Sequence, residues 1–112
     1  MHQLTSRLAQ LGAVCAVALA FLLLAGPAAA QDGKTVYAQK GCAACHGPKG
    51  DKPLQPSYPK LDGQNADYLV AQLKAFKTQQ RKSGQAALMW GMAAQLSDAE
   101  MVAVSKWLQA QK

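Results

Sequence analysis

The sequence predicts a small all-α domain of three to five short helices, and three observations support that prediction. Apolar residues recur at helical spacing in three separate segments. No segment shows the alternation of apolar and polar residues that is typical of a half-buried strand. Two long stretches containing proline or glycine separate the helical segments. Because such short helices cannot close a core around long loops unaided, we expect another group to fill the centre.

Residues 1–30 differ in kind from the rest of the chain. Arg7 is the only charged side chain before Asp32, and a continuous small and apolar run extends through residues 11–25. The segment closes with three alanines before Gln31. These are the marks of a secretory signal peptide that is cleaved near Ala30, and they predict export to a bacterial periplasm. The alternative is an uncleaved membrane anchor, but the run is shorter than the roughly 20 residues that a spanning helix needs.

Residues 31–112 are predicted to form one domain. A chain this short buries only about 60–65% of its surface, so it often needs a disulfide, a metal or a cofactor to complete its core. The whole chain has 12 Lys and Arg against 6 Asp and Glu, for a formal net charge of +6. The basic residues form no dense run and aromatic residues are few, which disfavours nucleic-acid binding. A basic surface favours encounter with acidic partner proteins instead.

The first two helical segments are predicted from their apolar positions. The first runs from about Gly33 to Lys40, and its apolar residues are Val36 and Tyr37. The second begins after Asn65, which is a good N-cap residue. Its buried face consists of Leu69, Leu73 and Phe76.

The third helical segment begins at Ser97, with Glu100 completing a capping box. Its apolar face consists of Met101, Val104, Ser105 and Leu108, with Trp107 beside it. Residues 47–63 contain four prolines, which exclude a regular helix there. Residues 78–96 contain two glycines and are likewise predicted to be irregular.

The group that fills the centre is indicated by Cys42-Ala43-Ala44-Cys45-His46. Cysteines at i and i+3 lie on one face of a helical turn, so both sulfurs can bond the two vinyl groups of one haem. Cys-x-x-Cys-His is the motif of covalent c-type haem attachment. The histidine that follows is aimed at the iron as its proximal axial ligand. The sequence therefore predicts one covalent haem c.

Three other interpretations of this motif are weaker. A structural zinc site needs four ligands, whereas residues 31–112 offer only Cys42, Cys45 and His46 from the Cys and His set. A thioredoxin-like redox pair requires strands, and none is predicted. A plain structural disulfide suits an oxidising compartment but explains neither the histidine nor the missing core.

The second axial ligand can be narrowed by elimination. His46 is the only histidine after residue 30, so two histidines of this chain cannot bind the iron together. The candidates are Met89, Met92, Met101, a lysine or an open position. Met101 falls on the apolar face of the last helix, where a methionine is more often part of the core. The spacing leaves the choice between Met89 and Met92 open.

From about Gly33 to Leu108 the chain resembles a class I cytochrome c, in particular a single-haem domain of the cytochrome c4 or c-553-like type. The resemblance implies the small cytochrome c fold, with helices and loops wrapped around one covalent haem. Only one Cys-x-x-Cys-His is present, so the two-haem arrangement of cytochrome c4 does not carry over. The matching pieces, in chain order, are Cys42-Ala43-Ala44-Cys45-His46-Gly47, Pro59-Lys60-Leu61-Asp62-Gly63-Gln64, Tyr68-Leu69, Gln72-Leu73, Phe76-Lys77, Arg81, Met89-x-x-Met92 and Leu96-Ser97-Asp98.

The resemblance also implies particular site residues. The family places its methionine ligand seven residues before the Leu of Leu-Ser-Asp, which is Met89 here. It implies that the carbonyl of Pro59 accepts a hydrogen bond from His46 Nδ1–H. Met92 is expected to line the haem pocket. Trp90 has no counterpart with a known role in the family, and we interpret it as a hydrophobic lid over the haem edge.

Gly33 and Tyr37 resemble the positions at which the first helix of the family crosses the last, where Trp107 lies here. A glycine at such a crossing permits the two helices to approach closely.

These observations predict a single-electron carrier and not an enzyme. The expected partners are redox proteins with acidic docking surfaces, and contact with a membrane is expected only through a membrane-bound redox complex. Lys40, Lys49 and Lys52 flank the haem motif and are candidates for the docking rim. The alternatives are an electron-transfer subunit of a larger dehydrogenase or oxidase, and a haem enzyme or ligand-binding protein with an open axial position.

Overall fold

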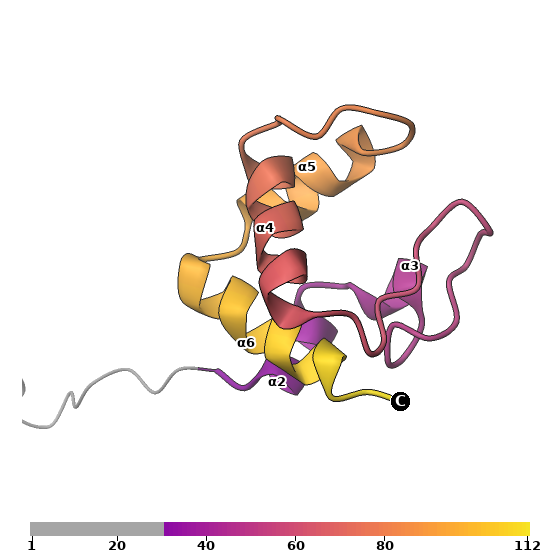
Figure 1. The fold of residues 1–112 in the computed structure, drawn as a ribbon, viewed down its shortest axis with the longest axis vertical. Helices are drawn as coiled ribbons and strands as arrows, with labels where there is room; N and C mark the ends of the chain where they lie inside the picture. The colour runs from indigo at the N-terminus through magenta and orange to yellow at the C-terminus, as the bar shows by residue number, and fades with distance from the viewer. Residues whose placement is uncertain (1–30) are drawn as a thin grey trace, which may run out of the picture.

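Five helices joined by loops make up residues 31–112, the part of the chain that this computed structural model describes (Figure 1). They are α2 (Gly33–Gln39), α3 (Ala43–His46), α4 (Ala66–Lys77), α5 (Ala87–Ala94) and α6 (Asp98–Gln109). No strand occurs within these residues, so the predicted all-α fold is confirmed. The predicted signal peptide, residues 1–30, lies outside the described residues.

Helices α2 and α6 cross in close contact at one end of the core. A Cβ atom added to Gly33 would overlap the carbonyl oxygen of Ala103 and lie 2.5 Å from Cβ of Trp107. The rings of Tyr37 and Trp107 pack beside this crossing with centroids 4.9 Å apart. The close approach expected at Gly33 is thus present, and its cause is the missing side chain.

Side-chain caps fix where the longer helices begin. Asn65 Oδ1 accepts from the backbone N–H of Tyr68 at the start of α4, at 3.0 Å. Ser97 and Glu100 form the predicted capping box at the start of α6. Both helices contribute to the main core, which also includes residues of α2 and the α5–α6 junction. Its buried members are Val36, Tyr37, Leu69, Leu96, Met101, Val104 and Leu108.

The prediction that residues 78–96 are wholly irregular is wrong, because Ala87–Ala94 form helix α5. Alanine, leucine and methionine dominate this segment, and their high helix propensity outweighs the cost of about 1 kcal/mol for Gly91 in the interior. The helix has no capping side chain at its N-terminus. It packs mainly against α4, where Phe76, Ala86 and Ala93 form a second, smaller apolar cluster.

The loop between α3 and α4 contains no regular helix, as its prolines predict. Its two ends meet at Gly50, whose carbonyl oxygen accepts from the N–H of Leu61 at 2.8 Å and of Asp62 at 3.2 Å. The N–H of Leu54 donates to the carbonyl of Cys45 at 2.9 Å, which holds the loop beside α3. None of the helices within residues 31–112 is long and apolar enough to cross a membrane.

Candidate haem site

A cavity of about 570 Å³ lies between α3, the loop that follows it, α4 and α5. Its wall is mostly apolar and includes members of both core clusters. The volume is within the range of about 300–1,000 Å³ that is usual for cofactor pockets. The cavity lies at the centre of the domain, where the short helices and long loops predict that another group completes the core.

Helix α3 brings both cysteines to this cavity. Cys42 precedes the helix and is half-buried, Cys45 is exposed, and both thiols are free. Burial raises the pKa of the Cys42 thiol, so that it stays protonated at neutral pH. A protonated thiol can add across a vinyl double bond, because the sulfur bonds one vinyl carbon and the thiol hydrogen passes to the other. The pair therefore fits a covalently attached haem.

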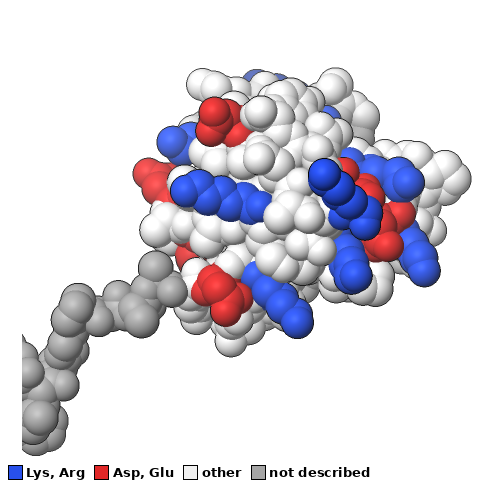
Figure 2. All heavy atoms as spheres, turned by 60° about the horizontal axis from the view of Figure 1, so that its bottom comes forward, with Lys and Arg blue, Asp and Glu red and all other residues white. Residues whose placement is uncertain are grey.

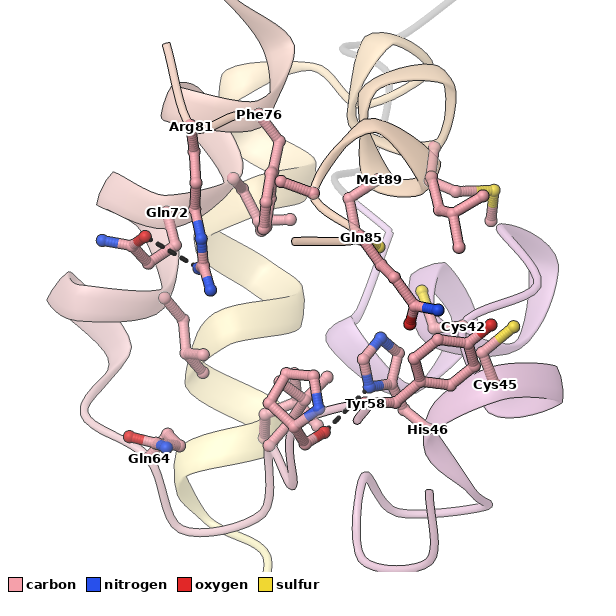
Figure 3. Close-up of a pocket in the computed structure, with 18 of the residues that line it drawn as sticks. Cys42, Cys45, His46, Tyr58, Gln64, Gln72, Phe76, Arg81, Gln85 and Met89 are labelled. Atoms are coloured by element: carbon pink, nitrogen blue, oxygen red, sulfur yellow. Dashed lines mark hydrogen bonds between the residues drawn. The ribbon is translucent and has the colours of Figure 1, made fainter. Parts of the chain in front are cut away.

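His46 is buried, and its ring lies on the α3 side of the cavity (Figure 3). Its Nδ1 lies 3.0 Å from the carbonyl oxygen of Pro59. Because a carbonyl can only accept, Nδ1 donates its hydrogen in this contact, and the neutral tautomer that fits is the one whose Nε2 has a lone pair. This is the tautomer that a metal ligand requires, and the carbonyl contact fixes the orientation of the ring.

The end of α3 is held by a contact that sequence reasoning missed. The hydroxyl of Tyr37 donates to the carbonyl oxygen of Gly47, directly after His46, at 2.5 Å. Burial raises the pKa of Tyr37 to about 12, so the hydroxyl keeps its proton throughout the neutral range. Sequence spacing identifies Tyr37 as a core residue but carries no signal for this hydrogen bond.

Both methionine candidates come from α5. Met89 and Met92 are half-buried, lie one helical turn apart and line the cavity. Trp90 lies between them in sequence but does not line the cavity. Its indole N–H donates to the carbonyl oxygen of Arg81 at 2.9 Å, and its ring packs on the smaller apolar cluster. The structure thus brings both methionines to the cavity and directs Trp90 elsewhere.

The cavity wall also carries Arg81, for which the sequence suggested no function. Its Nη1 donates to Oε1 of Gln72 at 2.9 Å, and its guanidinium carbon lies 4.6 Å from the centroid of the Phe76 ring. These residues are separated along the chain by the turn that follows α4, so no regular spacing relates them. Only the folded chain brings them together.

The wall contains no Asp or Glu. Across residues 31–112, no three His, Cys, Asp or Glu side chains come together in a way that could hold a bare metal ion. The zinc interpretation therefore finds no ligand set there, whereas two thiols and one oriented imidazole on an apolar cavity suit a haem.

Comparison with known proteins agrees with this geometry. The sequence profile of the family described as "Cytochrome c" matches residues 30–112. Cytochrome c-554(548) of Halomonas halodenitrificans is 45% identical over 71 residues, which cover 63% of this chain and 84% of that protein. Cytochrome c4 of Azotobacter vinelandii is 34% identical over 89 residues, which cover 79% of this chain. The thiosulfate dehydrogenase electron acceptor of Thiomonas intermedia is 41% identical over 70 residues, or 62% of this chain.

The matches differ in how much of each relative they cover. The matched segments span 42% of the Azotobacter protein and 32% of the Thiomonas protein, so the chain corresponds to less than half of these two longer relatives. The family profile, in contrast, matches all of the described residues. The chain is therefore a member of the cytochrome c family, whose prosthetic group is a covalently attached haem c.

Proposed function

We propose that this chain is a single-electron carrier in which His46 and Met89 are the axial ligands of the haem iron. The observation that carries the proposal is the oriented imidazole of His46, whose Nδ1–H is bonded to Pro59 and whose Nε2 is left available to a metal. Met89 lies on the α5 side of the same cavity. The attached haem supplies an iron that alternates between the ferrous and ferric states by gaining or losing one electron.

The residues of the chain support this use in three ways. The carbonyl of Pro59 holds the His46 ring in one orientation and raises its basicity. A methionine sulfur is a neutral ligand, which favours the ferrous form. The apolar wall, to which Leu69 and Phe76 contribute, excludes water and disfavours additional charge.

The partners we propose are redox proteins with acidic docking surfaces. Lys49, Lys52 and Lys60 are exposed on the loop between α3 and α4. Figure 2 shows basic side chains, with acidic ones among them, on the side of the molecule where this loop lies. Leu54 of the same loop is 70% exposed and is bonded through its N–H to Cys45, so an apolar side chain lies beside the exposed cysteine.

Lys40 is less available for docking than its place in the sequence suggests. Its Nζ lies 3.5 Å from a carboxylate oxygen of Glu100 and donates to the carbonyl of Gln95 at 3.2 Å. We therefore centre the proposed docking surface on the lysines of the α3–α4 loop.

We further propose that residues 1–30 are a signal peptide and that the carrier works in the periplasm. The apolar run without charges supports this, as does a family match that begins at residue 30. The mass of the holoprotein purified from a periplasmic extract tests it, because cleavage near Ala30 predicts a chain that begins at Gln31. A chain that still begins at Met1 would favour the membrane anchor.

A second candidate is a carrier that serves one dehydrogenase as a bound subunit. The relative from Thiomonas intermedia is a thiosulfate dehydrogenase electron acceptor, which favours this candidate. Co-purification of the chain with a large redox enzyme at physiological salt would support this candidate over a freely diffusing carrier.

The visible spectrum of the ferric holoprotein tests the ligand set directly. Iron bonded to a methionine sulfur gives a weak far-red band, which we expect in the wild type and in Met92→Ala but not in Met89→Ala. A band that survives in Met89→Ala and vanishes in Met92→Ala would reassign the ligand to Met92 and leave the function intact. A wild type that lacks the band and readily binds carbon monoxide when reduced would favour the open-site alternative.

A further inference from the structure

Two lysines from other parts of the chain contact the C-terminal end of α5. The Nζ of Lys77, the last residue of α4, donates to the carbonyl oxygen of Leu96 at 2.6 Å. The Nζ of Lys40, directly after α2, donates to the carbonyl oxygen of Gln95 at 3.2 Å. Gln95 and Leu96 are the first two residues after α5. The helix that carries both candidate methionines is therefore bonded at this end to α4 and to the end of α2.

Ammonium groups suit this end of a helix. Backbone carbonyls at and just beyond the C-terminus of a helix have no hydrogen-bond partner within it, and the helix dipole gives this end a partial negative charge. A lysine ammonium offers a positive charge and three donors. Hydrogen bonds from a charged donor are about twice as strong as those between neutral groups. The bond from Lys77 is also partly shielded from solvent.

Helix α5 needs such contacts to keep its position. It has eight residues, no side-chain cap at its start and a glycine, Gly91, in its interior. A helix this short is not stable alone. Its packing on α4 through Phe76 and Ala93 is apolar, and apolar contacts have no directional preference. The indole of Trp90 bonds the carbonyl of Arg81, which fixes the helix to the segment before it and not to another helix.

The two lysine contacts lie close to the methionines along the helix. Met92 is one turn before Leu96, and its carbonyl accepts from the N–H of Gln95 at 3.3 Å. Met89 is one further turn back, and both methionines line the cavity. A shift of the C-terminal end of α5 therefore moves both sulfurs relative to His46 on the α3 side of the cavity.

We propose that Lys77 and Lys40 are positioning residues for the axial methionine. They hold the C-terminal end of α5 so that Met89 stays within reach of the haem iron. Lys77 does not line the cavity, and the Nζ of Lys40 already contacts Gln95 and Glu100, so both act through the helix and not on the iron. The proposal rests on the proposed axial methionine, and it holds equally for Met92 because that residue is on the same helix.

The rate at which the ferrous holoprotein binds carbon monoxide tests the proposal. Carbon monoxide can bind only while the methionine is off the iron, so the rate reports how often that ligand leaves. In Lys77→Gln the rate should rise by about fivefold to tenfold, the equivalent of one net hydrogen bond. Lys77→Arg keeps a charged donor and should restore a rate near that of the wild type. Lys74→Gln, which removes the same charge from an exposed position on α4, should leave the rate unchanged.

Lys40→Gln tests the second contact. Its control is Glu100→Gln, which removes the ion pair of Lys40 and leaves the bond to Gln95 in place. Carbon monoxide should bind faster to Lys40→Gln than to Glu100→Gln. Equal rates in the two variants would overturn the assignment of Lys40.

Amide hydrogen exchange of the same holoproteins separates the helix from the ligand. Lys77→Gln should speed the exchange of the α5 amides by a similar factor and leave those of α6 unchanged. Faster exchange without faster binding of carbon monoxide overturns the proposal, because Lys77 then stabilises α5 without positioning the methionine. An unchanged rate in Lys77→Gln, or an equal rise in Lys74→Gln, also overturns it.

The far-red band of the ferric wild type is recorded first. Without that band, the axial methionine and this proposal fail together. With it, the rates of carbon monoxide binding decide the role of the lysines alone.

Discussion

At the scale of single residues, the geometry of α3 depends on hydrogen bonds from residues outside it. The hydroxyl of Tyr37, on α2, donates a hydrogen bond to the carbonyl of Gly47. The carbonyl of Pro59, in the loop that follows α3, accepts a hydrogen bond from His46. The two contacts fix the helical turn and the imidazole ring independently. A change in either should alter the haem environment without removing a haem ligand.

Replacing Tyr37 with phenylalanine should destabilise the holoprotein by about 1 kcal/mol, the net value of a typical hydrogen bond. The loss is modest because the carbonyl of Gly47 also accepts from the N–H of Gly50 at 3.3 Å. Denaturant titration of the holoprotein measures it. Since the pKa of Tyr37 is raised to about 12, the difference should be constant through the neutral and mildly alkaline range. Tyr68→Phe, at a 51% exposed position, is the control and should change little.

The site residues that sequence could identify are those joined by short spacing. Cys42, Cys45 and His46 lie within one helical turn, so their pattern alone predicts a shared ligand. Met89 and Met92 could not be separated from spacing, because one turn of α5 brings both to the cavity.

The Arg81 and Gln72 pair could not be found from spacing, since it depends on how the chain turns after α4. At that turn Gln79 has φ of 60°, a left-handed conformation that few non-glycine residues adopt. Nothing in the local residue pattern predicts such a turn.

At the scale of helices, the crossing of α2 and α6 sets a strict size limit at Gly33. Gly33→Ala should destabilise the holoprotein by about 1–3 kcal/mol, because the new methyl group overlaps the backbone of Ala103 and the helices must separate. Gly91→Ala is the matched control within α5, where the added methyl group meets open space. It should stabilise the protein by up to about 1 kcal/mol. Equal effects of the two changes in thermal unfolding would contradict the crossing argument.

The capping box at the start of α6 should make the stability of the protein depend on pH. The pKa of Glu100 lies below its ordinary value of 4.5, mainly because the carboxylate accepts a hydrogen bond from the backbone N–H of Ser97. The positive charge of Lys40 lowers this pKa further. A carboxylate whose pKa is lower in the folded than in the unfolded protein stabilises the fold at pH values above its unfolded-state pKa. That stabilisation is lost as the pH falls through its folded-state pKa. The stability difference between wild type and Glu100→Ala should therefore be largest near neutral pH and shrink below about pH 4.

Glu100→Gln is the control for this pH dependence, because an amide can still accept from Ser97 but does not titrate. Its stability relative to Glu100→Ala should stay nearly constant with pH. A wild-type protein whose advantage over Glu100→Ala also stays constant with pH would contradict the assignment.

The helices themselves were predictable to different degrees. Those that begin after Asn65 and Ser97 have both a cap and an apolar face, and the structure confirms them. Helix α5 has neither a cap nor a clear polar face, and Gly91 interrupts it. Its residues favour a helix, but eight residues are too few to form a stable helix alone, so α5 also depends on packing against α4, which the local residue pattern does not reveal.

At the scale of the whole molecule, the excess of basic side chains should direct encounter with anionic partners. Replacing Lys49, Lys52 and Lys60 with glutamine should slow electron transfer to hexacyanoferrate, an anion, by about tenfold at low salt. The dependence of the rate on ionic strength should also become flatter, since screening then has less attraction to remove. Stopped-flow oxidation of the ferrous protein measures both.

The control removes the same charge from another part of the surface, at Lys74, Lys82 and Lys106, all of which are exposed. This variant should retain most of the wild-type rate. An equal slowing in both variants would show that net charge matters and that the loop has no special position.

The packing of α5 determines which part of the protein unfolds locally most readily. The helix packs mainly on α4, and the main core of α2, α4 and α6 is complete without it. Units with few buried contacts open locally at a lower free energy than the whole protein. The amides of α5 should therefore exchange their hydrogens with solvent sooner than those of α6. Because both candidate methionines are on α5, a local opening of this helix would carry them away from the cavity while α3 and His46 stay folded.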